Sequence, residues 1–333
     1  MTYSSGSLIL AADYNSFVGN VSGNSINNVW GTGTVGDLGW GQSNIANVAT
    51  GGTVTATQWS SLVTTLTAMG NQSNTAITTR TAPVAGNTIS ILANVATDIN
   101  SITNNRGNAA ASGTIYATWT GNIAKTAATA TNAAGWNITF TNTITFPSAA
   151  QARYFWNAGG LVRIDMSKTS TGTDKDVDWN TFVATTGTLY ISGRVNGAAQ
   201  TIAGTSYTGV TRVGGSGTPS PFTTTTGWYS LTPGAAATNL FKLADTVSPY
   251  SGDYIQVAAN VNSGSTTLTL VSTWHDNGYT LAGENNAISG GTDTASPYSA
   301  FGTAPAVLVR YLPPSTTYLT NSWGTPTIAA TVA

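Results

Sequence analysis

Charged residues are scarce in this 333-residue chain: only 7% of its positions are Asp, Glu, Lys or Arg, against about 25% in ordinary soluble domains. The net charge is −1 and no basic stripe occurs, so counterion-release binding to nucleic acid is not expected. The surface must therefore consist mainly of Thr, Ser, Asn, Gly and Ala. Such a surface causes little repulsion or desolvation cost when copies pack together, which favours a chain in contact with other subunits.

Cysteine is absent, which excludes disulfides, thiolate metal sites and cysteine nucleophiles. Long apolar runs are absent too, since no stretch approaches the ~18 apolar residues that span a bilayer, and we expect no membrane insertion. The first ten residues (MTYSSGSLIL) lack the basic and apolar regions of a conventional signal peptide. We therefore expect the chain to fold in a cytoplasm.

The remaining composition indicates a folded chain. Hydrophobic residues make up 41% of the sequence and ten residues are Trp, whereas disorder combines low hydrophobicity with high net charge. The length suits one large domain or two ordinary ones. Composition alone equally fits a secreted β protein with a hydroxyl-rich surface.

The first third of the chain contains an internal repeat that predicts helices. Residues 9–21 (ILAADYNSFVGNV) align without gaps with residues 54–66 (VTATQWSSLVTTL). Apolar residues of each copy recur at helical spacing, and Gly70 follows the second copy where a helix end is expected. The apolar faces are Tyr14, Phe17, Val18 and Val21, continuing through Ile26, Val29 and Trp30, and then Trp59, Leu62, Val63, Leu66 and Met69.

A glycine-rich stretch, residues 31–42, separates the two copies. Its spacing matches neither the P-loop nor the dinucleotide fingerprint, so we interpret it as a connector with Trp40 packed against the core. A third helix is predicted from Asn87 to Arg106, again from apolar spacing. Residues 104–113 then have the composition of a linker.

Beyond residue 113 the apolar period changes to two, which predicts strands. A long half-buried strand is expected at residues 136–146, before Pro147. In residues 152–165 two apolar runs flank a Gly-Gly pair, and we interpret this segment as a central β-hairpin that turns at residues 157–160. Other predicted strands are Leu189–Ile191, Trp228–Tyr229, Tyr254–Val257, Leu268–Trp274 and Val307–Leu312, with one helical turn at residues 178–183.

These patterns predict an α+β fold, with a small helical N-terminal region at residues 1–112 and a mainly antiparallel, β-sandwich-like body at residues 113–333. We expect the helical region to dock on other subunits and the body to be exposed or to form contacts between copies. The candidate docking residues are Tyr14, Phe17, Trp30, Trp40, Trp59 and Leu62.

Catalytic chemistry finds little support in the sequence. His275 is the only histidine, no nucleophile motif accompanies it, and Asp276 beside it is expected to accept hydrogen bonds in a turn. Glu284 is the only glutamate, and a hydrolase would have to combine it with Asp165 or Asp253 from unlinked loops. We therefore predict no enzyme and no cofactor. Arg153, Arg163 and Asp165 are expected to form structural pairs.

Three aspartates and two tryptophans are candidate binding residues. Asp174, Asp176 and Asp178 alternate as at the start of a calcium loop, but the Gly and Glu that such a loop needs at its sixth and twelfth positions are missing. We interpret the cluster as a solvated loop, with a calcium site as the alternative. Exposed aromatic rings on a β-sandwich can stack on sugars, and Trp228 and Trp323 are the candidates for glycan contacts.

Several segments together resemble virion structural proteins of tailed phages, notably marine and cyanobacterial ones. In chain order they are AADYNSF (11–17), VWGTG (29–33), GWGQ (39–42), TATQWSSL (55–62), RYFWNAGG (153–160) and YLTNSWGTP (318–326). The resemblance implies a non-enzymatic fibre, fibre adaptor or other appendage of the tail or neck, located in the virion and assembled in the host cytoplasm. Its partners would be other copies of itself and other virion proteins.

The sequence departs from an extended fibre shaft, because the last two hundred residues show no β-helix or collagen period. A compact appendage and a head decoration protein therefore both remain open. A carbohydrate-binding module that recognises a host surface glycan is the alternative from a different functional class.

Overall fold

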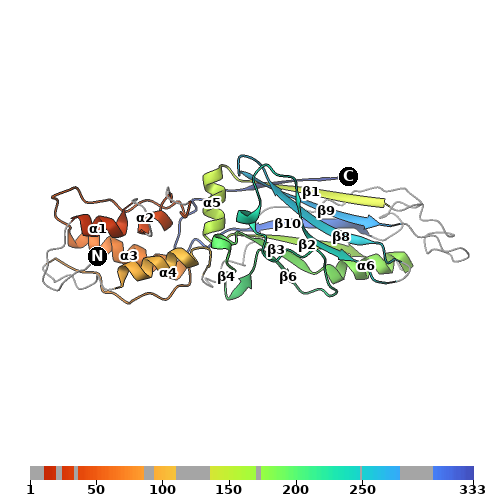
Figure 1. The fold of residues 1–333 in the computed structure, drawn as a ribbon, viewed down its shortest axis with the longest axis horizontal. Coiled ribbons are helices and arrows are strands. Elements are labelled where there is room, and N and C mark those ends of the chain that lie inside the picture. Colours follow the sequence, from red (N-terminus) through yellow and green to blue (C-terminus); the bar gives the residue numbers. More distant parts are fainter. Residues whose placement is uncertain are drawn as a thin grey trace, which may run out of the picture.

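The computed structural model describes residues 11–19, 25–33, 37–85, 94–109, 136–169, 174–247, 250–277 and 303–333. The molecule is elongated, with helices α1 to α4 gathered at one end and a body of antiparallel sheets toward the other (Figure 1). The α+β fold with a sheet-rich body is confirmed. Within the described ranges, no helix is both long and apolar enough to cross a membrane.

The helices are α1 (Ala11–Val18), α2 (Ile26–Val29), α3 (Ala56–Gln72), α4 (Val95–Asn105), α5 (Ala149–Asn157) and α6 (Asp174–Thr186), with short 3-10 turns η1 (Val195–Gly197) and η2 (Trp228–Ser230). The strands are β1 (Trp136–Thr145), β2 (Leu161–Thr169), β3 (Thr188–Ser192), β4 (Gln200–Ile202), β5 (Thr205–Tyr207), β6 (Val210–Val213), β7 (Thr238–Ala244), β8 (Tyr254–Val261), β9 (Thr267–Asp276), β10 (Thr303–Leu312) and β11 (Thr327–Val332).

Helix α3 begins with a capping box at Thr55 and Gln58. The Gln58 amide donates to the Thr55 hydroxyl (3.3 Å) and the Thr55 amide donates to the Gln58 side chain (2.8 Å), so two N-terminal amides have partners. The predicted apolar face is buried. The predicted helix end at Gly70 is wrong, because Gly70 lies within α3. A Cβ at this position would lie 3.1 Å from the Thr75 carbonyl oxygen. This glycine admits the close approach of a loop, and the helix continues to Gln72.

The two copies of the internal repeat pack on each other. Helices α1 and α3 begin at corresponding positions, Ala11 and Ala56. Tyr14 and its counterpart Trp59 meet edge to face with their ring centroids 5.3 Å apart, and the Tyr14 hydroxyl donates to the Gln58 carbonyl. Equivalent side chains of the repeat therefore build one core.

Helix α4 occupies the second half of the predicted third helix. It starts after Asn94, whose φ of 62° is not helical, and residues 86–93 lie outside the described ranges. The predicted linker at residues 104–113 is wrong at its start, since α4 runs to Asn105 and Ala109 bridges to Ile202 of the body. Residues 110–113 lie outside the described part.

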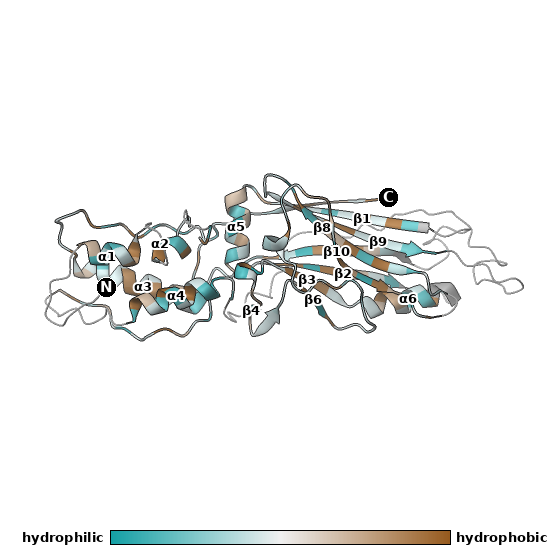
Figure 2. Cartoon of the chain, in the orientation of Figure 1, coloured by the Kyte–Doolittle hydropathy of each residue, from teal (hydrophilic) through white to brown (hydrophobic). Residues whose placement is uncertain are grey.

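Two large antiparallel sheets form most of the body, a five-stranded sheet in the order β11-β1-β9-β8-β7 and a four-stranded sheet in the order β10-β2-β3-β6, and β4 pairs with β5 in a small third sheet. Every second residue of β9 is buried, and both hydrophobic and hydrophilic residues occur along the strands of the body (Figure 2). Side chains of both sheets and of the N-terminal helices belong to a single apolar cluster. The helical end and the body therefore share one continuous core.

The segment predicted as a central hairpin is a helix followed by a strand. Ser148 caps α5, because its hydroxyl accepts from the Gln151 amide (3.2 Å). Gly159 has φ of 91°, and the Gly160 amide donates to the Phe155 carbonyl (2.9 Å). These features form a helix C-cap of the Schellman type. Hairpin turns and C-caps both need positive φ, which is why the Gly-Gly pair fits either structure.

The other strand predictions have mixed outcomes. Strands β1, β3, β8, β9 and β10 coincide with predicted segments. Trp228–Tyr229 is wrong as a strand, since both residues lie in the 3-10 turn η2. The single helical turn expected at residues 178–183 is the thirteen-residue helix α6.

Candidate assembly surfaces and clefts

The candidate docking residues lie inside the chain's own core. Tyr14, Phe17, Trp40, Trp59 and Leu62 are buried, and the half-buried Trp30 packs against the same cluster and donates from its indole to the Ser43 carbonyl (3.0 Å). The prediction that these residues are free for docking is therefore wrong. Each short helix buries its apolar face against its neighbours, and an apolar stripe looks the same whether the covering surface is intramolecular or not.

The two glycan-stacking candidates are buried as well. Trp228 is 6% exposed and stacks on Trp156 with ring centroids 5.4 Å apart. Trp323 is 2% exposed. Neither ring offers a free face to a sugar, so their assignment as stacking platforms is wrong.

The acidic cluster lies in helix α6 and not in a loop. A calcium loop needs a turning backbone that aims alternate carboxylates at one ion, whereas residues 174–186 are helical. Both the predicted solvated loop and its calcium-loop alternative require a loop backbone, and both are therefore wrong. The side chains of Asp174 and Asp176 lie outside the described part. Among the residues that can be assessed, no group of three or more metal-ligating side chains is present.

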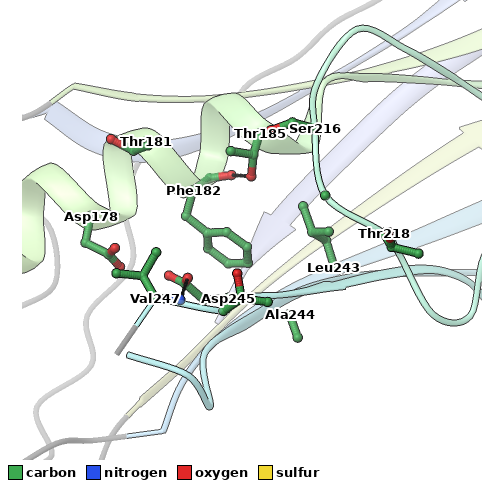
Figure 3. A pocket seen from close by; sticks show the side chains of 12 residues that line it. Asp178, Thr181, Phe182, Thr185, Ser216, Thr218, Leu243, Ala244, Asp245 and Val247 are labelled. Atoms are coloured by element: carbon green, nitrogen blue, oxygen red, sulfur yellow. Dashed lines mark hydrogen bonds between the residues drawn. The ribbon is translucent and has the colours of Figure 1, made fainter. Parts of the chain in front are cut away.

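Asp178 instead faces a cleft of about 390 Å³ between α6 and the end of β7 (Figure 3). Phe182 from α6 and Leu243 from β7 are apolar lining residues, and the carboxylate of Asp245, which accepts from the Val247 amide (2.8 Å), lines the cleft as well. The volume is in the range of small-molecule sites. The cleft can accept hydrogen bonds from a small polar ligand.

One arginine shapes a wall of this cleft. The Arg212 guanidinium donates to the carbonyls of Thr186 (2.9 Å) and Gly217 (3.0 Å), and also to those of Thr185 and Ser216. Burial lowers the pKa of Arg212. These bonds tie the loop at residues 214–218 to the C-terminal carbonyls of α6, where a cation is favoured by the helix dipole.

His275 has a structural environment on β9. One ring nitrogen, Nδ1, lies 2.8 Å from the Asn137 side-chain oxygen, and the ring stacks on Tyr254 with centroids 4.5 Å apart. Partial burial lowers its pKa below the ordinary value, although Asp276 opposes this. Asp276 is the buried last residue of β9 and so does not lie in a turn.

The carboxylates of the hydrolase alternative have structural partners. Asp165 pairs with Arg163 at 2.7 Å, and the Asp253 side chain accepts from the Asn277 amide (2.8 Å). Glu284 lies outside the described residues. The pairing of Arg163 with Asp165 is confirmed as structural.

A polar joint, here defined as Trp40, Gln42, Arg153, Asn157 and Thr320 with their polar partners, connects the helical end to the body. The Trp40 indole donates to the carbonyls of Asn157 (2.9 Å) and Arg106 (3.2 Å). The Gln42 amide group donates to the Thr320 carbonyl (3.0 Å) and accepts from the Thr320 amide (2.8 Å). The predicted packing of Trp40 against the core is confirmed.

The Asn157 side chain has a hydrogen-bond partner at both its nitrogen and its oxygen. Its Nδ2 donates to the carbonyls of Asp37 (2.8 Å) and Gly39 (3.0 Å), while its Oδ1 accepts from the Tyr229 hydroxyl (2.9 Å). Arg153, in the same helix, pairs with Asp37 at 2.8 Å, which confirms it as a structural pair. Polar contacts between residues more than one hundred positions apart therefore fix the helices to the sheets.

Burial changes the acidity of two groups at this joint. It lowers the pKa of the Arg106 guanidinium to about 10, although Tyr229 opposes the shift. It raises the pKa of the Tyr229 hydroxyl, although 42% of that residue is exposed. The Tyr229 hydroxyl is held at the joint by its hydrogen bond to the Asn157 side-chain oxygen. Both groups donate hydrogen bonds here, Arg106 to the Thr103 carbonyl (2.8 Å) and Tyr229 to the Asn157 side-chain oxygen (2.9 Å).

The edge of the five-stranded sheet is a further candidate surface. Strand β11 pairs with β1 on one side, and its residues alternate between exposed and half-buried. No described residue covers its other side, and β11 runs along the upper margin of the body in Figure 1. The sequence analysis missed this strand. The signal was the alternation of Ile328, Ala330 and Val332 with small residues after Pro326.

Comparison of the chain with protein-family models, with curated proteins and with solved structures finds no match.

Proposed function

We propose that the chain is a non-enzymatic virion structural protein of a tailed phage, which forms a fibre, fibre adaptor or other appendage by docking on the particle and on other copies of itself. Two features of the sequence support this function. The segments that resemble phage virion proteins run through nearly the whole chain, and the scarcity of charge suits repeated burial between subunits.

The observation that carries the proposal is the joint. Trp40 and Asn157 are fully buried and use their polar atoms to connect segments 117 to 120 positions apart, and the apolar core is continuous on both sides of them. A chain held in this way is one elongated unit of fixed length (Figure 1). An appendage needs such a unit, because it must hold one partner at a set distance from another.

The structure bears on the choice among the alternatives. Burial of Trp228 and Trp323 removes the two aromatic platforms of the carbohydrate-binding alternative. A head decoration protein would use the same rigid unit and differs only in its place on the particle.

Immunogold labelling of purified particles, from the virus that encodes this chain, tests the proposal. We expect regularly placed labels on the tail, the neck or their appendages, with the chain present in the particle in many copies by quantitative mass spectrometry. Labels on the capsid would instead identify the chain as a head decoration protein. Absence of the chain from purified particles would refute both.

A further inference from the structure

The free side of β11 has a defined set of unpaired backbone groups. The Thr139 amide donates to the Ala333 carbonyl (2.7 Å) and the Ala333 amide donates back to Thr139 (3.0 Å), so these two residues form a hydrogen-bonded pair. In an antiparallel ladder such pairs alternate along the strand. Ile328, Ala330 and Val332 therefore direct their N–H and C=O groups away from β1.

The opposite edge of the same sheet, at β7, has backbone partners. Residues 220–223 run along β7, where the Ser220 amide donates to the Lys242 carbonyl (2.7 Å), the Lys242 amide to Pro221 (2.9 Å) and the Thr223 amide to Leu240 (2.9 Å). One edge of the sheet is thus covered by the chain's own backbone. The edge at β11 has no such cover from any residue in the described ranges.

Strand β11 also lacks the features that keep edge strands apart. Proteins protect free edges with charged residues, prolines or bulges. Residues 327–333 (TIAATVA) contain no charge and no proline, and the register with β1 runs without a shift from residue 327 to residue 332. The edge is therefore regular, neutral and open to another strand.

We propose that β11 pairs antiparallel with β11 of a second copy of this chain, around a two-fold axis at Ala330. This inference rests on the self-association in the proposed function and names the surface that performs it. With the axis at Ala330, Ile328 faces the partner's Val332, and all three outward residues find hydrogen-bonded partners. The result is about six backbone bonds, two for each of three pairs.

The side chains fit the same register. Ile328 and Val332 lie on the inner face, where they pack against the core but stay half-buried. Pairing places Ile328 beside the partner's Val332, and Val332 beside the partner's Ile328. The apolar layer then extends across the axis. Every cross-strand contact is between uncharged residues, so two identical edges meet without repulsion, as a two-fold interface requires.

The test uses the full chain and two variants of β11. Ala330→Pro removes an outward N–H and leaves the bonds of Ala329 and Thr331 to β1 in place, because proline is tolerated on the free side of an edge strand. Ala329→Lys, the control, adds a charge on the exposed outer face without changing the edge backbone. Sedimentation velocity should show concentration-dependent dimers for the wild type and the control, and at least a tenfold weaker association for Ala330→Pro.

Amide hydrogen exchange by NMR reads the register directly. In the assembled wild type, the amides of Ile328, Ala330 and Val332 should exchange at least about tenfold more slowly than at a concentration where it is monomeric. Ala329 and Thr331 should be protected at both concentrations. In Ala330→Pro the protection of Ile328 and Val332 should be lost, while retained protection of Ala329 and Thr331 would show that β11 remains folded on β1.

A wild type that stays monomeric at millimolar concentration, or an Ala330→Pro variant that assembles like the wild type, would overturn this inference. A monomeric wild type would also remove self-association from the proposed function, whereas the place of the chain in the virion is tested separately by its presence in particles. Conversely, a chain that dimerises through β11 but is absent from particles would refute the proposed function and leave the pairing intact.

Discussion

The substitution Asn157→Asp tests the joint without changing its volume. The wild-type side chain donates two hydrogen bonds, to the carbonyls of Asp37 and Gly39, and accepts one from Tyr229. A carboxylate keeps the acceptor but has no N–H to donate. The buried Gly39 carbonyl oxygen and the part-buried Asp37 carbonyl oxygen then lose their donors and face a negative charge.

The expected cost follows from these contacts. Each lost bond costs about 1–1.5 kcal/mol, and burial of a poorly compensated carboxylate adds more, so the free energy of unfolding should fall by about 4 kcal/mol in total. For a chain of this length that corresponds to a fall in Tm of roughly 6 °C. Thermal and urea unfolding, followed by tryptophan fluorescence, measure both values.

The pH dependence separates this explanation from simple misfolding. Burial beside carbonyl oxygens raises the pKa of the introduced carboxyl in the folded state above its unfolded value. The folded variant therefore holds its proton more tightly, and its deficit relative to the wild type should shrink as the pH falls from 7 toward 4. Asn239→Asp, at an exposed position on β7, is the matched control and should change stability by less than about 0.5 kcal/mol. If Asn157→Asp behaved like this control, the joint would not hold the two parts together.

Three smaller predictions concern the body and the rim of the joint. Ser272 is fully buried and its hydroxyl has no partner among the described residues, so Ser272→Ala should raise the free energy of unfolding by about 1 kcal/mol in urea titrations. Burial lowers the pKa of His275, so the unfolded chain binds the proton at a higher pH than the folded chain does. The free energy of unfolding should therefore fall as the pH drops below about 6.5, and His275→Gln should make this fall smaller. Asp37→Asn breaks an ion pair whose carboxylate is 70% exposed and should cost less than about 1 kcal/mol by thermal unfolding.

Periodicity predicted the elements whose burial is one-sided. Strand β1 alternates apolar and polar residues except at Asn142, β9 buries every second residue, and α3 carries five apolar residues on one face. Such patterns follow directly from the geometry of strand and helix. The α+β class and the order of its two parts could therefore be read from the chain.

The aromatic segment at residues 152–160 shows where periodicity fails. Tyr154, Phe155 and Trp156 favour a strand by composition, and a Gly-Gly pair fits a hairpin. The deciding signal lies just upstream, where Pro147, Ser148 and two alanines mark a helix start. The cap and the local helix propensity override the β propensity of the three aromatic residues.

The candidate sites were the least predictable part. An apolar face has the same sequence pattern whether its own chain or a partner covers it, so the docking residues could not be told from core residues. Trp228 and Trp323 are buried by segments distant in sequence. The open edge at β11 is a property of sheet order, since it depends on which strand ends the sheet, and no local pattern encodes that order.

Electron-microscopic reconstruction of the purified particle tests the central claim most directly. The account predicts density for many copies of one elongated unit, helical at one end and β-rich at the other, on the tail, the neck or an appendage. A reconstruction of the complete particle with no density that fits this unit, from a preparation that lacks the chain by mass spectrometry, would contradict it.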